Sequence, residues 1–336
     1  LIGLAYTDPM HLVKHRVLEE RQPEVITLGT SRVLPFRSFY FQEPGLFYNC
    51  GRSVDQVQDL ESFLLSYPGE KPRLIILGLD QDFFGVDDED LDNPPRSYPS
   101  EDSSYGSRLI KGTKALFDAV KEGDIESGEV LPRAASYIGC NARLYGEGFR
   151  RDGSYLYARN LFAKNPKDEY SFSRTIELIN ENEGRFTSAE RIHPGTIGEL
   201  KDFIELCKSH GIHVVAFLPP YAHKVYLELE EDRPEFPHVF KLHATLQPIF
   251  RDNGFRLFDF SNLKSLGSND YETYDGFHAS ETAYLKLIRI MAENDPFLAG
   301  FLDNKAIDEL IAKAHSARQL VEELEERHPK RPASGK

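Results

Sequence analysis

Residues 24–32 read EVITLGTSR, a short run rich in β-branched side chains that stops at Gly29 before a polar turn. Such a run predicts a buried strand that ends in a turn. Residues 73–79, RLIILGL, predict a second buried strand, and residues 54–67 carry apolar side chains at the three- and four-residue spacing of a helix. A strand, a helix and a strand in this order are the unit of a parallel sheet.

The same alternation returns in the second half of the chain. Residues 212–218 and 255–260 predict two more strands. The predicted helices cover residues 172–182, 195–210, 237–253 and 279–293, with a last charged helix at 303–327. About four core strands that alternate with helices predict an α/β fold. We expect an open, doubly wound, mainly parallel sheet with helices on both faces, of the flavodoxin-like kind.

The length of 336 residues suits one large domain with additions. We expect an α/β domain over residues 1–300, with an insertion at about 87–153 that is rich in turn-forming residues, apart from a helical stretch at 107–121. Residues 301–336 are expected to form a C-terminal helix and a disordered tail. Residues 1–5 are apolar and begin without methionine, so we expect them to be the remainder of a longer segment.

The composition argues against several classes of partner. The chain has 54 acidic and 40 basic residues and a formal net charge of −14, which repels phosphate backbones, so we expect no nucleic-acid partner. Cys50, Cys140 and Cys207 form neither a disulfide framework nor a zinc motif. His210 and His213 straddle the glycine of a turn and would not share a face. We therefore expect no metal and no cofactor.

Polar side chains follow each of the four predicted strands. Ser31 comes after the first strand, Asp80 after the second and His223 after the third, while Asp275 and His278 come after the fourth. In open α/β sheets, sites collect outside the carboxyl ends of the strands. We therefore expect these residues to face the same edge of the sheet.

Ser31 is the candidate nucleophile. A serine hydroxyl attacks only when a base takes its proton and donors hold the oxyanion that forms. A serine at a strand-to-helix turn would supply its own backbone N–H as one of those donors. The alternative is a plain helix cap, because serine and threonine are favoured at that position.

Asp275 and His278, in Asp-Gly-Phe-His, are the candidate acid and base. A triad needs a histidine base and a carboxylate that orients it, and a spacing of three residues presents both groups to one serine. The alternative is an acidic first turn of the helix that follows.

The motifs together resemble the SGNH/GDSL hydrolase superfamily. The first block of that family, a strand followed by Gly-Asp-Ser, matches residues 29–31, and its Asp-x-x-His block matches residues 275–278. Its second-block glycine falls on Gly51, and its Gly-x-Asn-Asp block aligns with residues 78–81. The resemblance covers residues 6–291. It implies a Ser31–His278–Asp275 triad, with the N–H groups of Ser31 and Gly51 holding the oxyanion.

The chain departs from the family pattern at two positions. Thr30 replaces the aspartate of the first block, and Asp80 stands where the family has an oxyanion-binding asparagine. An ionised carboxylate cannot donate a hydrogen bond to an oxyanion. Other donors near these blocks are candidates for that role: Arg32, Asn49, Arg52 and Gln81.

Within the superfamily, the chain resembles an extracytoplasmic, membrane-tethered branch near the alginate O-acetylation and teichoic-acid D-alanylation proteins. The motifs that carry this are Gly-Thr-Ser-Arg, Tyr-Asn-Cys-Gly, Ile-Leu-Gly-Leu-Asp and Pro-Pro-Tyr-Ala-His. The resemblance implies a periplasmic or cell-surface location, an N-terminal membrane helix ahead of Leu1, and work with a membrane-bound O-acyltransferase. It also implies that His223 binds substrate, although a surface loop explains this histidine equally well.

These inferences predict a serine esterase or O-acyltransferase that acts on an acylated, by expectation acetylated, extracellular polysaccharide. Residues 153–159 place two tyrosines and an arginine in a loop, where they suit a sugar ring; core packing is an equal alternative for the tyrosines. The alternative function is a non-catalytic binding or assembly module of a polysaccharide-modification complex, which the Asp80 departure favours.

Overall fold

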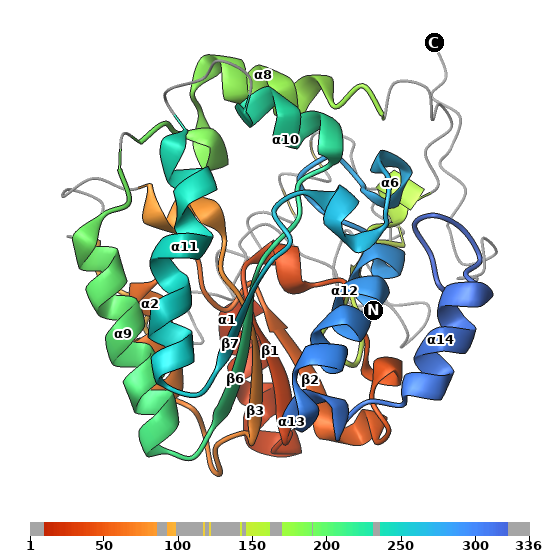
Figure 1. Cartoon of the computed structure of the whole chain (residues 1–336). Helices are drawn as coiled ribbons and strands as arrows, with labels where there is room; N and C mark the ends of the chain where they lie inside the picture. Colours follow the sequence, from red (N-terminus) through yellow and green to blue (C-terminus); the bar gives the residue numbers. More distant parts are fainter. Residues whose placement is uncertain are drawn as a thin grey trace.

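The computed structural model describes residues 10–85, 93–98, 146–161, 170–189, 191–230 and 236–321, together with positions 117, 121 and 142. In these ranges a parallel sheet of five strands forms the centre of the molecule, in the order β2-β1-β3-β6-β7 (Figure 1). Its strands are β1 (Val25–Gly29), β2 (Phe47–Gly51), β3 (Leu74–Gly78), β6 (His213–Leu218) and β7 (Arg256–Asp259). The predicted α/β, doubly wound fold class is confirmed. Strands β2 and β3 lie on opposite sides of β1, so the strand order reverses there, and the carboxyl ends of β1 and β3 form a topological switch point.

The sheet has one strand more than expected, because the sequence pattern hid β2. Asn49 interrupts its apolar run, yet every residue of β2 is buried. The Asn49 amide donates hydrogen bonds to the carbonyl oxygens of Val33 (2.8 Å) and Phe36 (3.0 Å), so the polar group is satisfied inside the core. The register pairs Gly29 with Gly51 and aligns the ends of β1 and β2.

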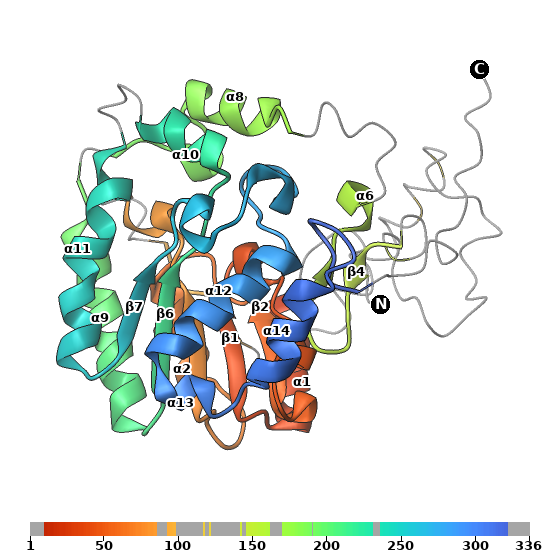
Figure 2. The same ribbon diagram turned by 45° about the vertical axis from the view of Figure 1, so that its right-hand side comes forward.

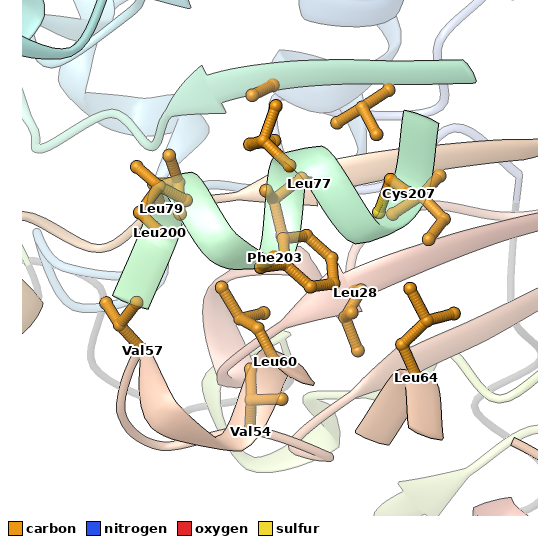
Figure 3. Packing of buried hydrophobic residues seen from close by; sticks show 14 of the residues in the cluster. Leu28, Val54, Val57, Leu60, Leu64, Leu77, Leu79, Leu200, Phe203 and Cys207 are labelled. Carbon is orange, nitrogen blue, oxygen red and sulfur yellow. The ribbon is translucent and has the colours of Figure 1, made fainter. Parts of the chain in front are cut away.

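Helices cover both faces of the sheet, as predicted (Figure 2). One face carries α2 (Gln58–Leu65), α9 (Pro194–Ser209) and α11 (Pro237–Asp252), and the other carries α12 (Glu281–Asn294), α13 (Pro296–Ala299) and α14 (Asn304–Ala312). Figure 3 shows the first of these interfaces, where α2 and α9 pack on the side chains of β1 and β3. Leucine, valine and phenylalanine side chains here are almost fully buried, so each contributes about 1.5–3 kcal/mol of transfer free energy.

The predicted helices at 172–182, 195–210, 237–253 and 279–293 match α8 (Ser173–Glu181), α9, α11 and α12 to within two residues at each end. Helices α1 (Met10–Arg21) and α10 (His223–Glu230) escaped prediction, as did the four-residue helices α6 (Ala158–Leu161) and α13. Helices α8 and α10 contact each other beyond one end of the sheet (Figures 1 and 2). Among the described residues, no helix has both the length and the apolar character that crossing a bilayer requires.

The predicted C-terminal helix at 303–327 is wrong for residues 313–321, and its last residues, 322–327, lie outside the described ranges. Helix α14 ends at Ala312, and the chain continues as a loop that side chains of α12's first turn hold in place. Ser280 Oγ donates to the carbonyl of Ala317 (3.0 Å) and Thr282 Oγ1 to that of Ser316 (3.2 Å). These bonds favour a turn over continued helix.

Several predicted segments lie wholly or mostly outside the described residues: the start of the chain, the helix at 107–121, the insertion at 87–153 and the tail. The end of the insertion is described, and it forms an antiparallel hairpin of β4 (Gly148–Phe149) and β5 (Tyr155–Leu156), followed by α6 (Ala158–Leu161). Short 3-10 helices complete the fold, at Ser31–Val33 (η1), Ser38–Tyr40 (η2), Pro44–Leu46 (η3), Gln81–Phe84 (η4), Gly184–Phe186 (η6), Leu263–Leu266 (η7) and Asp270–Glu272 (η8).

The hairpin is fastened to the sheet by a buried ammonium group. Lys14 of α1 is fully buried, and its Nζ donates to the carbonyl oxygens of Asn49 (2.9 Å), Gly51 (2.6 Å) and Gly153 (2.9 Å). The same Nζ lies 4.8 Å from the ring centre of Phe149. Three carbonyls and an aromatic face compensate the charge for its lost hydration.

Replacing Lys14 with methionine should therefore destabilise the fold. The variant keeps the aliphatic stem but leaves three buried carbonyl oxygens without this donor, so we expect the free energy of unfolding to fall by about 3 kcal/mol or more. Urea denaturation measures the change. Lys208→Met, at an exposed lysine of α9 that contacts Asn253, is the matched control and should change it by less than about 0.5 kcal/mol. A loss below 1 kcal/mol for Lys14→Met contradicts this account.

Candidate active site

The three residues predicted as nucleophile, base and carboxylate form one chain of hydrogen bonds at the carboxyl edge of the sheet. Ser31 begins η1 directly after β1, and its Oγ lies 2.9 Å from Nε2 of His278. The Nδ1 of His278 lies 2.8 Å from Oδ2 of Asp275. Asp275 and His278 lie in the loop between η8 and α12. Two motifs near opposite ends of the domain's sequence therefore come into contact in the fold.

The turn that presents Ser31 depends on its two neighbours. A Cβ atom on Gly29 would lie 2.8 Å from Cγ1 of Val33 and 3.1 Å from the carbonyl oxygen of Gly78, so only glycine fits. Thr30 provides the helix cap, because its Oγ1 accepts the N–H of Arg32 (3.2 Å). The cap is therefore Thr30, and the Ser31 hydroxyl is left to bond His278.

The loop that holds Asp275 is built around a residue with positive φ. Gly276 has φ +85°, a conformation that favours glycine, and a Cβ there would lie 2.8 Å from Cγ2 of Val225. This turn lets Oδ1 of Asp275 accept the N–H groups of Phe277 (3.0 Å) and His278 (2.7 Å) while Oδ2 bonds the imidazole. Ser280 caps α12 through the N–H of Ala283, so Asp275 is not its cap.

Asp275 is held in its ionised form. Burial raises the pKa of this carboxyl, but the His278 imidazole and the hydrogen bonds from His278 and Phe277 together have the larger, opposite effect and bring the pKa down to about 2. An ionised carboxylate only accepts, so it fixes the proton of neutral His278 on Nδ1 and leaves the lone pair of Nε2 directed at Ser31. The arrangement suits proton transfer from the serine hydroxyl.

The triad opens into a cavity of about 360 Å³ that Ser31 and His278 both line. Its other lining residues are predominantly polar: Arg52, Asp55, Glu147, Asn160, Arg185 and Asp275, with Tyr155, Tyr157 and Leu34. Such a cavity suits a small, hydrogen-bonding ligand.

Tyr155 of β5 and Tyr157, which directly precedes α6, contribute the aromatic wall of this cavity. Tyr157 donates its hydroxyl to the carbonyl of Ser31 (3.3 Å), and its ring lies 5.7 Å from that of His278 and stacks on Tyr274 at 4.5 Å. Tyr155 donates its hydroxyl to Glu147 (3.0 Å). The tyrosines thus line the cavity and also pack against other rings, and the expectation that this stretch holds a sugar ring stays a prediction.

Sequence reasoning missed Asp55, Glu147, Asn160 and Arg185. Arg185 comes from η6 and reaches the cavity because it binds Asp82 (2.7 Å) and Asp55 (3.5 Å). None of the four lies in a recognisable motif, and all four lie between the two triad motifs in the sequence. Only tertiary packing brings them together.

Two of the predicted oxyanion groups have other partners. The N–H of Gly51 donates to Oδ1 of Asn49 (2.8 Å), while the Asn49 amide is bound to Val33 and Phe36. Both groups are buried and neither residue lines the cavity. The expectation that they hold an oxyanion is therefore wrong for this conformation, because Asn49 uses its side chain to build β2. The backbone N–H of Ser31 lies at the start of η1, where it has no partner within its own helix, and its role as an oxyanion donor stays a prediction.

Arg32 is a structural residue and not a substrate ligand. It is buried between the rings of Tyr221 and Phe277, each 4.4 Å from its guanidinium carbon. It donates to Oε1 of Gln81 (2.7 Å) and to the carbonyl of Pro219 (2.9 Å). Gln81 is fully buried and binds the same carbonyl of Pro219. Arg32 and Gln81 therefore link the ends of the strands to each other beneath the site.

His223 lies apart from the cavity, contrary to its predicted role in substrate binding. It begins α10, and its backbone N–H donates to Oδ1 of Asp270 (2.6 Å). Its ring contacts Asn262 (3.3 Å) and Lys264 (3.3 Å), so it joins α10 to the η7 loop.

Asp80 is buried completely and supports the nucleophile turn from below. Its Oδ2 accepts the hydroxyl of Thr30 (2.7 Å), the same hydroxyl that caps η1. Burial raises the pKa of this carboxyl to about 6, against the opposing charges of Arg32 and Arg185 and with the help of Asp82. Asp80 does not line the cavity. The position where an oxyanion donor was expected therefore holds a residue that binds the side chain of Thr30.

Comparisons of the chain with protein-family models, curated proteins and solved structures gave no match. Within the described ranges, no three His, Cys, Asp or Glu side chains are grouped so that they could hold a metal ion. The account of the site therefore depends on its geometry and on the motifs that the sequence carries.

Asp80 should make stability depend on pH. Between pH 4 and 6 the folded chain binds more protons at this carboxyl than the unfolded chain, so its contribution to stability falls as pH rises. Asp80→Asn removes this titration. We expect the unfolding free energy of the wild type, minus that of the variant, to drop by about 2 kcal/mol between pH 4 and pH 7. Denaturant titrations of both proteins measure it, and a difference that stays constant with pH contradicts the account.

Proposed function

We propose that this chain is a serine-dependent esterase or O-acyltransferase of the SGNH type. The observation that carries the proposal is the hydrogen-bonded series Ser31–His278–Asp275 at the mouth of a polar cavity. Ser31 Oγ attacks the acyl carbonyl while Nε2 of His278 takes its proton. The tetrahedral intermediate then expels the alcohol, which recovers that proton from His278, and the acyl group remains on Ser31.

The second half of the cycle decides between the two activities. Water attacking the acyl-enzyme gives an esterase, whereas a glycan hydroxyl gives an O-acyltransferase. In both cases His278 removes the proton of the attacking group and returns it to Ser31 Oγ. The Asp275 carboxylate stabilises the imidazolium that forms in each half.

The cavity supports a short acyl group on a polar alcohol. Leu34 is its one aliphatic lining residue among those described, so a long acyl chain would find little apolar surface there. Tyrosine rings and charged side chains are the groups that bind sugar hydroxyls and ring faces. We therefore propose an acetylated extracellular polysaccharide as substrate. The motif resemblance adds an extracytoplasmic location, a membrane tether and a membrane-bound O-acyltransferase as partner.

A second candidate function is a non-catalytic binding or assembly module with the same fold. The observation that favours it is the engagement of Gly51 and Asn49 within β2, together with a carboxylate at position 80. A fold that kept the triad but lost its oxyanion donors would still bind an acylated glycan.

Turnover of a chromogenic acetyl ester and labelling by a fluorophosphonate probe test the proposal. We expect Ser31→Ala to abolish labelling and His278→Ala to lower turnover by at least about 10³-fold, because the hydroxyl loses its base. Asp275→Asn should lower turnover by a similar factor, since the wrong tautomer of His278 then faces Ser31. Ser209→Ala, at the exposed end of α9, is the matched control and should keep full activity.

The same assay separates the alternatives. A wild type that neither turns over the ester nor accepts the label overturns catalysis and leaves the binding module. If turnover occurs, an added acetylated donor and an oligosaccharide acceptor distinguish transfer from hydrolysis, because mass spectrometry detects acetyl groups on the acceptor.

A further inference from the structure

We propose that Tyr157 is a positioning residue of this site, because its hydroxyl holds the backbone of Ser31 while its ring packs against the imidazole of His278. The inference rests on the proposed function, since it names the side chain that sets the geometry between nucleophile and base. Tyr157 directly precedes α6 and lines the same cavity as Ser31 and His278.

The first observation is the attachment of the segment around Tyr157 to the nucleophile turn. The Tyr157 hydroxyl donates to the carbonyl oxygen of Ser31 (3.3 Å), which also accepts the N–H of Leu34 (3.2 Å). In β5, the backbone N–H of Tyr155 donates to the carbonyl oxygen of Leu34 (3.4 Å). The first residue of η1 and its C-cap are therefore both bonded to this segment, and a rotation of the Ser31 peptide would break the bond to Tyr157.

The second observation concerns the rings around the imidazole of His278. The ring centre of Tyr157 lies 5.7 Å from that of His278, with the ring planes at 42°, and the Phe277 ring lies 5.0 Å away at 86°. The hydrogen bond from Nδ1 to Asp275 fixes one edge of the imidazole but still allows the ring to tilt about that bond, because the terminal torsion of histidine has a broad minimum. Contacts with neighbouring rings resist this tilt.

The third observation is that these contacts form a closed circuit. The backbone carbonyl of His278 accepts the N–H of Tyr274 (2.8 Å), and the Tyr274 ring stacks on Tyr157 at 4.5 Å with the planes at 27°. The hydrogen bond between Ser31 and His278 (2.9 Å) and the bond from Tyr157 to Ser31 close the circuit. Tyr157 contacts each of the other three residues, so its removal would break three contacts of this circuit.

The chemistry of the phenol suits a positioning role. Burial raises the pKa of the Tyr157 hydroxyl well above its ordinary value, so the group keeps its proton and remains a donor to Ser31 throughout turnover. The carbonyl that it binds is not the reacting group, and no bond forms or breaks at Tyr157. Its effect reaches the reaction through Ser31 and His278, where a misplacement on the order of 1 Å costs about 10²-fold in rate.

Two substitutions separate the hydroxyl from the ring, with a chromogenic acetyl ester as substrate. Tyr157→Phe removes the hydrogen bond to Ser31 and keeps the ring contacts, so we expect kcat to fall by at least about threefold. Tyr157→Leu removes both, so we expect kcat to fall by about 10²-fold while KM changes by less than about threefold. Tyr226→Phe, which removes the hydroxyl of a half-buried tyrosine that packs on Phe240 in α10 and α11, is the matched control and should behave as wild type.

The rate of labelling by a fluorophosphonate probe gives a readout that glycan binding does not influence. The probe requires a Ser31 that His278 activates, so both Tyr157 variants should lose labelling rate by the same factor as kcat. In the His278→Ala background, where no base remains to be positioned, Tyr157→Leu should change the residual labelling rate by less than about threefold, because residues that act as a unit are not additive.

Each outcome decides one point. An active wild type with a Tyr157→Leu variant that retains kcat within about threefold overturns the inference and leaves the proposed function standing. A loss confined to KM, or a loss of labelling that persists in the His278→Ala background, also overturns it. If Tyr157→Leu does not fold, Tyr157→Phe decides, and a labelling rate that falls by less than about threefold overturns the inference. A wild type that neither turns over nor labels overturns the proposed function, and this inference falls with it.

Discussion

The arrangement of this site depends on the hydrogen bonds of one buried residue, Thr30. Its hydroxyl donates to Asp80 beyond β3 and accepts the N–H of Arg32, which shapes the turn that presents Ser31. Its carbonyl accepts the N–H of Arg52 beyond β2. One residue thus joins three neighbouring strand ends at the switch point of the sheet, where polar backbone would otherwise be buried without partners. A threonine hydroxyl can both donate and accept, so it pairs with the Asp80 carboxylate while it caps η1.

Much of this could be predicted from the sequence, because the decisive patterns are local. Short apolar runs indicated four of the strands, and helical spacing indicated α9, α11 and α12. The triad was predictable because its residues directly follow strands, and a parallel sheet brings such positions to one edge. Strand β2 was not, since Asn49 looks like a loop residue until its partners Val33 and Phe36 are known. The oxyanion donors were misassigned for the same reason, because the sequence does not show which polar groups are already hydrogen-bonded in the folded chain. The cavity wall of Glu147 and Arg185 carries no local signal at all.

A complete triad beside a displaced set of donors has two physical interpretations. In the first, the oxyanion is held by the Ser31 N–H and by donors other than the Gly51 N–H and the Asn49 amide, which have partners in the core. In the second, the fold keeps the Ser31–His278 pair while its binding surface serves a different purpose. The polar cavity, the ionised Asp275 and the aromatic contact of Tyr157 with His278 are compatible with both. The difference between them lies in the transition state, because only there does an oxyanion require a donor.

The C-terminal loop after α14 has a consequence for how the site loses order. The carbonyls of Ser316 and Ala317 in this loop accept hydrogen bonds from Thr282 and Ser280, close to His278, and Arg318 donates to the carbonyl of Asn160 in the cavity wall. His278 is thus adjacent to a segment that lies outside the sheet, and segments of that kind can open in local fluctuations below the free energy of global unfolding. Amide exchange at residues 276–282 should then follow the opening of this loop and not that of the sheet. The molecule would lose its base before it loses its fold.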